Sequence, residues 1–259
     1  IILGESSISV IIPAYNEEKL IKPTLENIPP LFDRGYVVDD CSPDNQNSVI
    51  EKCILNDARI ELLKHETNQG PGGAIITGYQ KSSQDDYDIA VVVGGDFQMP
   101  LEEVENLLEP LVNKIADYSK GNRFLLSQLD TTLKRMPRTR LLGNWIITGV
   151  TKIASGYYKI MDVVDGYTAI TKEAIDIIDW SKAWKKYGYP MDFLIRLNAY
   201  GLRVIDIPRT AKYFAINDLF GVTHPYVWHN IRFYYDPIAG RLIPIGFDAG
   251  YSNSQLNNL

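Results

Sequence analysis

The chain has 259 residues, of which 45% are apolar and 22% are charged, and its formal net charge is −6. This composition is typical of a globular protein with one sizeable core, and the negative charge argues against nucleic acid, which binds positive surfaces. Two cysteines are too few for a disulfide framework or a zinc cluster, and no apolar run approaches the roughly 20 residues of a membrane-spanning helix. A cytoplasmic location is therefore expected.

Strands and helices are predicted to alternate through the first half of the chain. The apolar spacing predicts strands over 8–13, 35–40 and 60–64 and from Ile89, and helices over 18–27, 46–56, 72–82 and 101–114. Such alternation is typical of an α/β fold, a doubly wound parallel sheet with helices on both faces. Right-handed crossovers would bring the C-terminal ends of all the strands to one edge.

The second half has a less regular pattern. We expect a short strand over 116–120, a helix over 138–155, a strand over 165–171 followed by a helix from Lys172, a helix over 191–200 and a strand over 202–207. Periodicity is lost after about Asp218, where an aromatic and basic segment over 226–235 could lie at a membrane interface or pack on the main domain. We therefore predict one domain over 1–217 and an aromatic-rich C-terminal extension over 218–259.

Polar residues follow three of the predicted strands, at the edge where open sheets bind ligands. Tyr15 and Glu17 follow the first strand, the pair Asp39-Asp40 ends the second, and the strand from Ile89 is followed by Gly94-Gly95-Asp96. The turn Asn68-Gln-Gly-Pro-Gly-Gly73 enters a helix. Glycines let backbone N–H groups approach a phosphate, although such turns are commonly only structural. Together these groups predict a site for a nucleoside diphosphate and a hard cation.

These motifs occur in an order that resembles the family 2 glycosyltransferases, which have the GT-A fold. The matching segments are Ser-Val-Ile-Ile-Pro-Ala-Tyr-Asn-Glu, Val-Val-Asp-Asp-Cys-Ser-Pro-Asp, Asn-Gln-Gly-Pro-Gly-Gly-Ala, Gly-Gly-Asp-Phe-Gln-Met-Pro and Lys-Gly-Asn-Arg-Phe. The similarity runs from about residue 8 to residue 213 and is strongest to dolichol-phosphate-mannose and polyprenyl-phosphate-glucose synthases. It implies an inverting hexosyltransferase of cell-envelope glycan biosynthesis that uses a UDP- or GDP-linked sugar and a polyprenyl-phosphate acceptor. A saccharide-extending transferase and a non-catalytic nucleotide-sugar-binding protein remain alternatives.

The resemblance assigns the nucleotide contacts of the first two strand ends. Pro13, Tyr15 and Glu17 match the first nucleotide-contacting loop, in which Tyr15 could pack on a base and Glu17 could bind the ribose or the base. Asp40 matches the aspartate that recognises the base edge. Without the resemblance, the three residues of the first loop would be read as a strand stop, a core aromatic residue and a helix N-terminal acid.

Neighbouring residues of the same loops have other expected roles. Asp39 is expected to hold its turn, as Asp-Asp pairs before Ser-Pro often do, and Asp44 is expected to cap the next helix. Gly70 and Gly73 are expected to bring backbone N–H groups to the diphosphate.

The predicted cation site departs from the pattern of the family. The resemblance leads us to expect Asp-x-Asp followed by x-Gln, but Gly94 stands at the first position, while Asp96 and Gln98 are retained as metal ligands. Losing a carboxylate weakens the attraction for a dication. A weak Mg²⁺ or Mn²⁺ site completed by the diphosphate, metal-independent transfer and a degenerate enzyme are the three alternatives, and the first is favoured.

Basic residues are predicted on the acceptor side. Arg123 is expected beside the reacting sugar, and Arg138 belongs to the basic run 134–140, before the helix that lies beside acceptor and membrane in the resembling synthases. Arginines bind phosphate through two hydrogen bonds, so these residues could hold the diphosphate, a lipid phosphate or anionic headgroups at the inner face of the membrane. A solvated basic surface is the plainer interpretation.

Asp192 and Lys212 complete the predicted site. Asp192 matches the acid that serves saccharide-extending members as a catalytic base, although Pro190 replaces the glutamate of the family nearby. A phosphate acceptor is already anionic and needs no strong base, so Asp192 would then orient the acceptor, or act only as a helix N-terminal acid. Lys212 matches a basic position that could contact phosphate, and a surface lysine is the alternative.

Overall fold

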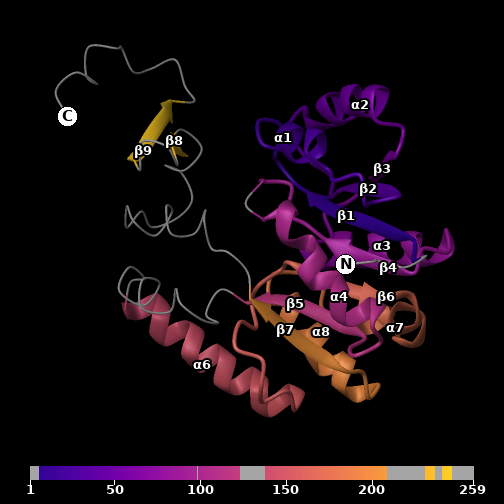
Figure 1. Ribbon diagram of the computed structural model, residues 1–259, viewed down its shortest axis with the longest axis vertical. Coiled ribbons are helices and arrows are strands. Elements are labelled where there is room, and N and C mark those ends of the chain that lie inside the picture. The colour runs from indigo at the N-terminus through magenta and orange to yellow at the C-terminus, as the bar shows by residue number, and fades with distance from the viewer. Residues whose placement is uncertain (1–5, 98, 123–137, 209–230, 237–240, 247–259) are drawn as a thin grey trace.

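The computed structural model describes residues 6–97, 99–122, 138–208, 231–236 and 241–246. Seven strands form one sheet in the order β3-β2-β1-β4-β6-β5-β7 (Figure 1). The strands are β1 (Ile8–Ala14), β2 (Arg34–Asp39), β3 (Ile60–Lys64), β4 (Ile89–Val92), β5 (Tyr118–Asn122), β6 (Thr168–Thr171) and β7 (Val204–Pro208). The predicted α/β class, with a mostly parallel sheet flanked by helices, is confirmed.

One strand of the seven-stranded sheet runs against the others, which is why the sheet is mostly and not fully parallel. β6 is antiparallel to both of its neighbours, β4 and β5. Its N-terminal end therefore lies at the edge where β1, β2 and β4 end. As a consequence, the segment 165–167, which was predicted to be part of the strand, forms the approach to β6 and reaches this edge.

Helices cover both faces of the sheet. The helices α1 (Ile21–Glu26), α2 (Gln46–Asn56) and α4 (Val104–Val112) pack on one face, and α3 (Pro71–Gln84), α7 (Lys172–Ile177) and α8 (Tyr189–Ala199) pack on the other. In β1, Val10 and Ile12 belong to the core on the face covered by α1, α2 and α4, and Ile11 belongs to the core on the opposite face. This alternation follows from the two-residue period of a strand, and a sheet buried on both faces explains the continuous apolar run.

Several helix boundaries differ from the prediction. α1 begins at Ile21, because residues 18–20 form turns in which the N–H groups of Leu20 and Ile21 donate to Glu17 O at 2.8 and 2.9 Å. The predicted helix over 101–114 is a 3-10 turn at residues 101–103 followed by α4. α8 begins two residues earlier than predicted, directly after Gly188, whose φ is 96°.

The helix α6 (Arg138–Ser155) lies outside the two helical layers and contacts α8 (Figure 1). Thr151 and Ser155 are buried on one side of α6. Its other side carries exposed apolar side chains, namely Trp145, Ile146, Ile147, Val150 and Ile153, with exposed fractions between 38% and 76%. Among the residues described, no helix combines the length and the apolar character needed to span a bilayer.

The C-terminal region contains regular structure that the sequence analysis did not predict. β8 (Ile231–Asp236) and β9 (Arg241–Gly246) pair as an antiparallel two-stranded sheet. The sequence has the two-residue period of a strand here, at Ile231, Phe233 and Tyr235. The many tyrosines of this region make that period hard to recognise. The predicted boundary at 217/218 lies outside the described residues and stays a prediction.

Candidate functional site

The loops after β1 and β2 are tied together at the sheet edge. Asp39 accepts hydrogen bonds from Ser42 N at 3.1 Å and from Gln46 Nε2 at 2.6 Å, which confirms that it holds the turn. Gln46 Oε1 in turn accepts from Glu17 N at 3.0 Å. The predicted cap at Asp44 is wrong, because Asn45 is the N-cap of α2; Asp44 lies one residue before it and accepts from Gln46 N at 3.3 Å. Gln46 is fully buried, and the sequence analysis missed it because its side chain acts across 29 residues.

Asp40 fastens the glycine-rich turn to the end of β2. Its buried carboxylate accepts from Gln69 N and Gly70 N, both at 2.7 Å. The same carboxylate lies 2.8 Å from His65 Nδ1, and His65 Nε2 lies 2.9 Å from Thr77 Oγ1. These contacts give Asp40 a structural role that the sequence analysis did not foresee. Its contact with a nucleobase stays a prediction.

The glycines of this turn are required by the loop that leads into α8. Gly70 has a φ of 93°, and a Cβ on it would lie 2.6 Å from Lys185 O. A Cβ on Gly72 would lie 2.7 Å from Tyr189 Cβ. Gly70 N donates to Asp40, and Gly73 N donates to Lys185 O at 3.2 Å. Both N–H groups therefore have acceptors within the protein, and their contact with a phosphate stays a prediction.

Tyr15 lies accessible at the end of β1. Half of its surface is exposed, at 50%, so it is not a core aromatic residue. Pro13 does not end the strand, since β1 continues to Ala14 and Pro13 pairs with Val38 in the parallel ladder. The accessible ring could stack on a base.

Glu17 points into the protein beside the glycine pair that follows β4. Its Oε2 atom is buried and has no hydrogen-bond partner in the part of the chain that is described. A Cβ on Gly95 would collide with this oxygen. Burial, followed by the carboxylates of Asp96 and Asp44, raises the pKa of Glu17 to about 8. A surface acid at a helix N-terminus would show neither the buried oxygen nor the raised pKa.

The residues near Asp96 fit an incomplete cation site. Gly94 has no side chain at the first ligand position, and a Cβ there would be crowded by Asp96 Oδ1 at 3.1 Å. Within the described ranges, no three acidic, histidine or cysteine side chains form a group able to hold a metal ion. Gln98 lies outside those ranges. Asp96 and Glu17 could bind a hard cation that takes its other ligands from a diphosphate.

The predicted acceptor residues are only partly described. Asp192, in the first turn of α8, accepts from Arg196 Nε at 2.7 Å and from Trp184 N at 2.9 Å. It is therefore held in an ion pair, and its catalytic role stays a prediction. Arg138 is the first residue of α6, but its side chain is not described. Arg123 and Lys212 lie outside the described residues.

A buried polar cluster lies where β5 and β7 end. Lys120 Nζ donates to Asp162 O, while Asn122 Nδ2 and Met161 N donate to Asp206 Oδ2 at 2.5 and 2.7 Å. Burial raises the pKa of Asp206 to about 6, although the charge of Lys120 opposes the rise. The sequence analysis missed this cluster. The available signal was Lys120, a lysine within a predicted strand.

Replacing Asp206 with asparagine is expected to stabilise the protein at pH 8 by about 1–3 kcal/mol. The folded state raises the pKa of the Asp206 carboxyl from 3.8 to about 6, so the folded protein binds this proton more tightly than the unfolded chain does. The resulting contribution to the free energy of unfolding is complete below about pH 4. That contribution is lost as the pH rises through about 6. Asparagine stays neutral and keeps an oxygen acceptor for the two donors.

Urea unfolding of the two proteins at pH 4.5 and pH 8 measures this effect. The difference should be small at the lower pH and largest at the higher. Asp86→Asn is the control, because the side chain of Asp86 is 90% exposed. An Asp206→Asn protein that is less stable than the parent at pH 8 would contradict the prediction.

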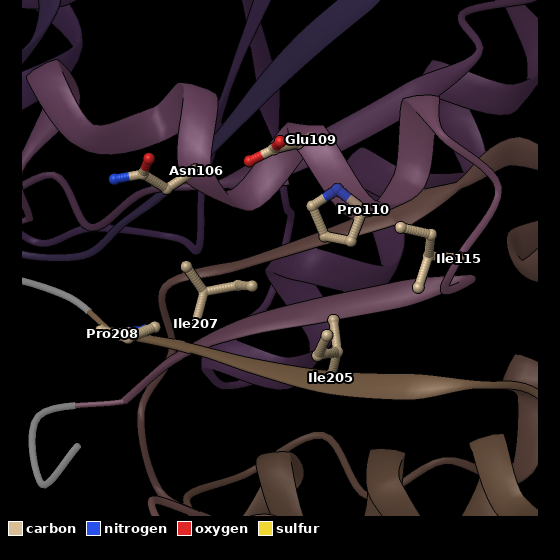
Figure 2. A pocket seen from close by; sticks show the side chains of 7 residues that line it. All are labelled: Asn106, Glu109, Pro110, Ile115, Ile205, Ile207 and Pro208. Atoms are coloured by element: carbon tan, nitrogen blue, oxygen red, sulfur yellow. The ribbon is translucent and has the colours of Figure 1, made fainter. Parts of the chain in front are cut away.

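A groove between α4 and β7 is a separate feature (Figure 2). It has a volume of about 440 Å³ and is lined by Asn106, Glu109, Pro110, Ile115, Ile205, Ile207 and Pro208. Figure 2 shows Pro110 and Ile115 on the side of the groove that faces Ile205 on β7. The described residues that line it include a carboxylate and no cationic side chain, so this lining does not suit a diphosphate.

The fold is that of the GT-A glycosyltransferases. The solved structure of glucosyl-3-phosphoglycerate synthase from Mycobacterium tuberculosis, in complex with Mg²⁺ and UDP, is similar with a TM-score of 0.56 and 16% identity, covering 94% of this chain and 88% of that one. A mycobacterial protein has a TM-score of 0.58 with 19% identity, covering 94% and 84%. These likenesses support the fold.

Sequence comparison identifies the family. The model of glycosyl transferase family 2 matches residues 9–178, and the chain belongs to this family and is a glycosyltransferase. A UDP-N-acetylglucosamine–dolichyl-phosphate N-acetylglucosaminyltransferase of Methanococcus voltae is 30% identical over 80% of this chain and 86% of its own length. An undecaprenyl-phosphate mannosyltransferase of Micrococcus luteus is 28% identical over 77% of this chain and 81% of its own length. The predicted family and enzyme class are confirmed.

Proposed function

We propose that this glycosyltransferase moves a hexose from a UDP-linked sugar to a polyprenyl phosphate, with inversion at the anomeric carbon. The observation that carries the proposal is the pairing of Asp192 with Arg196 at 2.7 Å. A saccharide hydroxyl would need a free base to remove its proton, whereas a phosphate oxygen is already a nucleophile. The named activities of the relatives from Methanococcus voltae and Micrococcus luteus, both on lipid phosphates, support the same acceptor.

The nucleotide is proposed to bind across the ends of β1, β2 and β4. Tyr15 offers an exposed ring for the base, and the loops that carry it are fixed through Gln46 and Asp39. The preference for UDP rests on the solved neighbour that contains UDP and on the UDP-sugar named for the Methanococcus voltae relative. A preformed edge would position the sugar without further ordering of these loops.

A divalent cation is proposed to bind at Asp96 with Gln98. When bound, Mg²⁺ or Mn²⁺ neutralises charge that develops on the departing diphosphate. Arg123 and Lys212 are proposed to add positive charge on the acceptor side, in keeping with their match to the motifs of the family. Asp96 contributes a single carboxylate, so the cation would be held only weakly in the absence of nucleotide.

The acceptor is proposed to reach the site at a membrane surface, against which α6 lies. The exposed side of α6 is apolar and includes Trp145 and Ile153, which are 68% and 76% exposed. The basic run 134–140 overlaps the start of this helix and would favour anionic headgroups. An apolar helix face beside basic residues is the pattern of a peripheral helix at a bilayer interface.

Sugar transfer from UDP-sugars to a short polyprenyl phosphate in the presence of Mn²⁺ tests the proposal. UDP release should depend on the lipid phosphate and should be accompanied by a glycolipid product. The Asp192→Asn protein should retain activity within about tenfold, because a phosphate acceptor needs no base. Equal release with saccharide acceptors, abolished by Asp192→Asn, would instead identify a saccharide-extending enzyme. Failure of UDP to raise the melting temperature, with no transfer from any donor, would contradict the proposal and favour the non-catalytic alternative that Gly94 suggests.

A further inference from the structure

The chain lacks the first carboxylate of the Asp-x-Asp pattern, yet it brings another acid to the same place. Gly94 has no side chain, and a Cβ there would meet Asp96 Oδ1 at 3.1 Å. Glu17, which belongs to the loop after β1, directs its carboxyl group at the adjacent Gly95. Asp96 follows Gly95 directly in the chain, so Glu17 and Asp96 both border the glycine pair. Two acids from separate strand ends therefore share the space around the glycine pair.

The position of Glu17 is built into the fold. Its backbone N–H donates to Gln46 Oε1 at 3.0 Å, and its carbonyl oxygen accepts from Leu20 N and Ile21 N at 2.8 and 2.9 Å. The opposite side is also fixed, since Thr24 Oγ1 donates to Gly95 O at 2.8 Å. The backbone of Glu17 and the glycine pair are thus held in place before any ligand binds.

One oxygen of the Glu17 carboxyl group has no partner among the described residues. This atom, Oε2, is buried without a hydrogen bond in the described part of the chain. A buried carboxyl oxygen without a hydrogen bond is unfavourable. A divalent cation between Glu17 and Asp96 would supply the missing partner, and its other ligands could be diphosphate oxygens.

We propose that Glu17 supplies the second carboxylate of the cation site, in place of the acid that Gly94 lacks. The inference rests on the proposed nucleotide-sugar function, and it assigns a metal-binding role to a residue that the motif comparison assigns to ribose or base. It requires that Glu17 reorient by a side-chain rotation once the cation and diphosphate are present. Gly95 makes the arrangement possible, because any side chain there would collide with Glu17.

Mn²⁺ binding to the UDP-bound protein, followed by the electron paramagnetic resonance signal of free Mn²⁺, tests the proposal without measuring activity. Glu17→Gln should weaken Mn²⁺ binding at least tenfold and leave the affinity for UDP without metal unchanged. Adding Gly94→Asp to Glu17→Gln should restore most of the lost affinity, because it returns a carboxylate to the site. Glu18→Gln, at the neighbouring acid that contacts Asn45 N at 3.4 Å, is the matched control and should bind Mn²⁺ normally.

Two results would overturn the proposed role of Glu17. Unchanged Mn²⁺ binding in Glu17→Gln, with weakened binding in Asp96→Asn, would overturn the proposal and leave Glu17 as a packed neutral acid. Weaker UDP binding without metal would instead identify it as a nucleotide contact and would also overturn the proposal. If Glu17→Gln does not fold, Glu17→Asp applies the same test, because the shorter side chain withdraws the carboxylate. Absence of UDP binding by the parent protein would count against the proposed function itself.

Discussion

Asp96→Asn is expected to lower sugar transfer by at least about 100-fold, the scale seen when a group that stabilises developing charge is removed. Asp96 occupies the second position of the Asp-x-Asp pattern, and Gly94 leaves no acid at the first. Asparagine keeps the size of the side chain but removes the charge that attracts a dication. Without the cation, negative charge on the departing UDP would be poorly compensated. UDP release measured over a range of Mn²⁺ concentrations checks this result.

The variant should also need more Mn²⁺ for half-maximal activity than the parent protein does. Glu105→Gln is a suitable control, because Glu105 is an exposed acid on α4 and its loss should leave transfer unchanged. Full activity of Asp96→Asn with an unaltered response to Mn²⁺ would show that transfer does not depend on a cation at this position.

The double substitution Trp145→Glu with Ile153→Glu is expected to weaken binding to anionic vesicles by at least about 100-fold. Burying one large apolar side chain contributes about 1.5–3 kcal/mol, so losing two at an interface removes about 3–6 kcal/mol. The added negative charges would also be repelled by anionic headgroups. Vesicle sedimentation measures the binding, and transfer to polyprenyl phosphate embedded in the vesicles should fall with it. The UDP-induced rise in melting temperature should be preserved, because α6 lies outside the layers that carry the nucleotide edge.

Leu55→Glu is the matched control for this experiment. Leu55 is 86% exposed on α2, so its replacement removes a comparable apolar side chain from a different surface. Vesicle binding that is equally strong in the parent and the double variant would exclude α6 as the membrane contact. Equal weakening by Leu55→Glu would show that the added charge, and not the position, is responsible.

The sequence by itself determined the elements whose apolar pattern is strong and local. The predicted bounds of α2 (46–56), β3 (60–64) and α6 (138–155) agree with the structure, because each segment has a clear hydrophobic period. The order of the motifs also determined the family, and the strand-helix alternation determined the α/β class. These properties depend on neighbours in the chain.

The tertiary structure decided how the functional groups are used. The reversal of β6 depends on which strands become neighbours, and no local period encodes it. Asp40 is engaged by groups 25–30 residues away, and the glycine-rich turn by a loop more than 100 residues later. The meeting of Glu17 with Gly95 likewise joins two separate strand ends. Such contacts form only after packing brings distant segments together, so residue types and spacing could indicate the site but not the partners of its side chains.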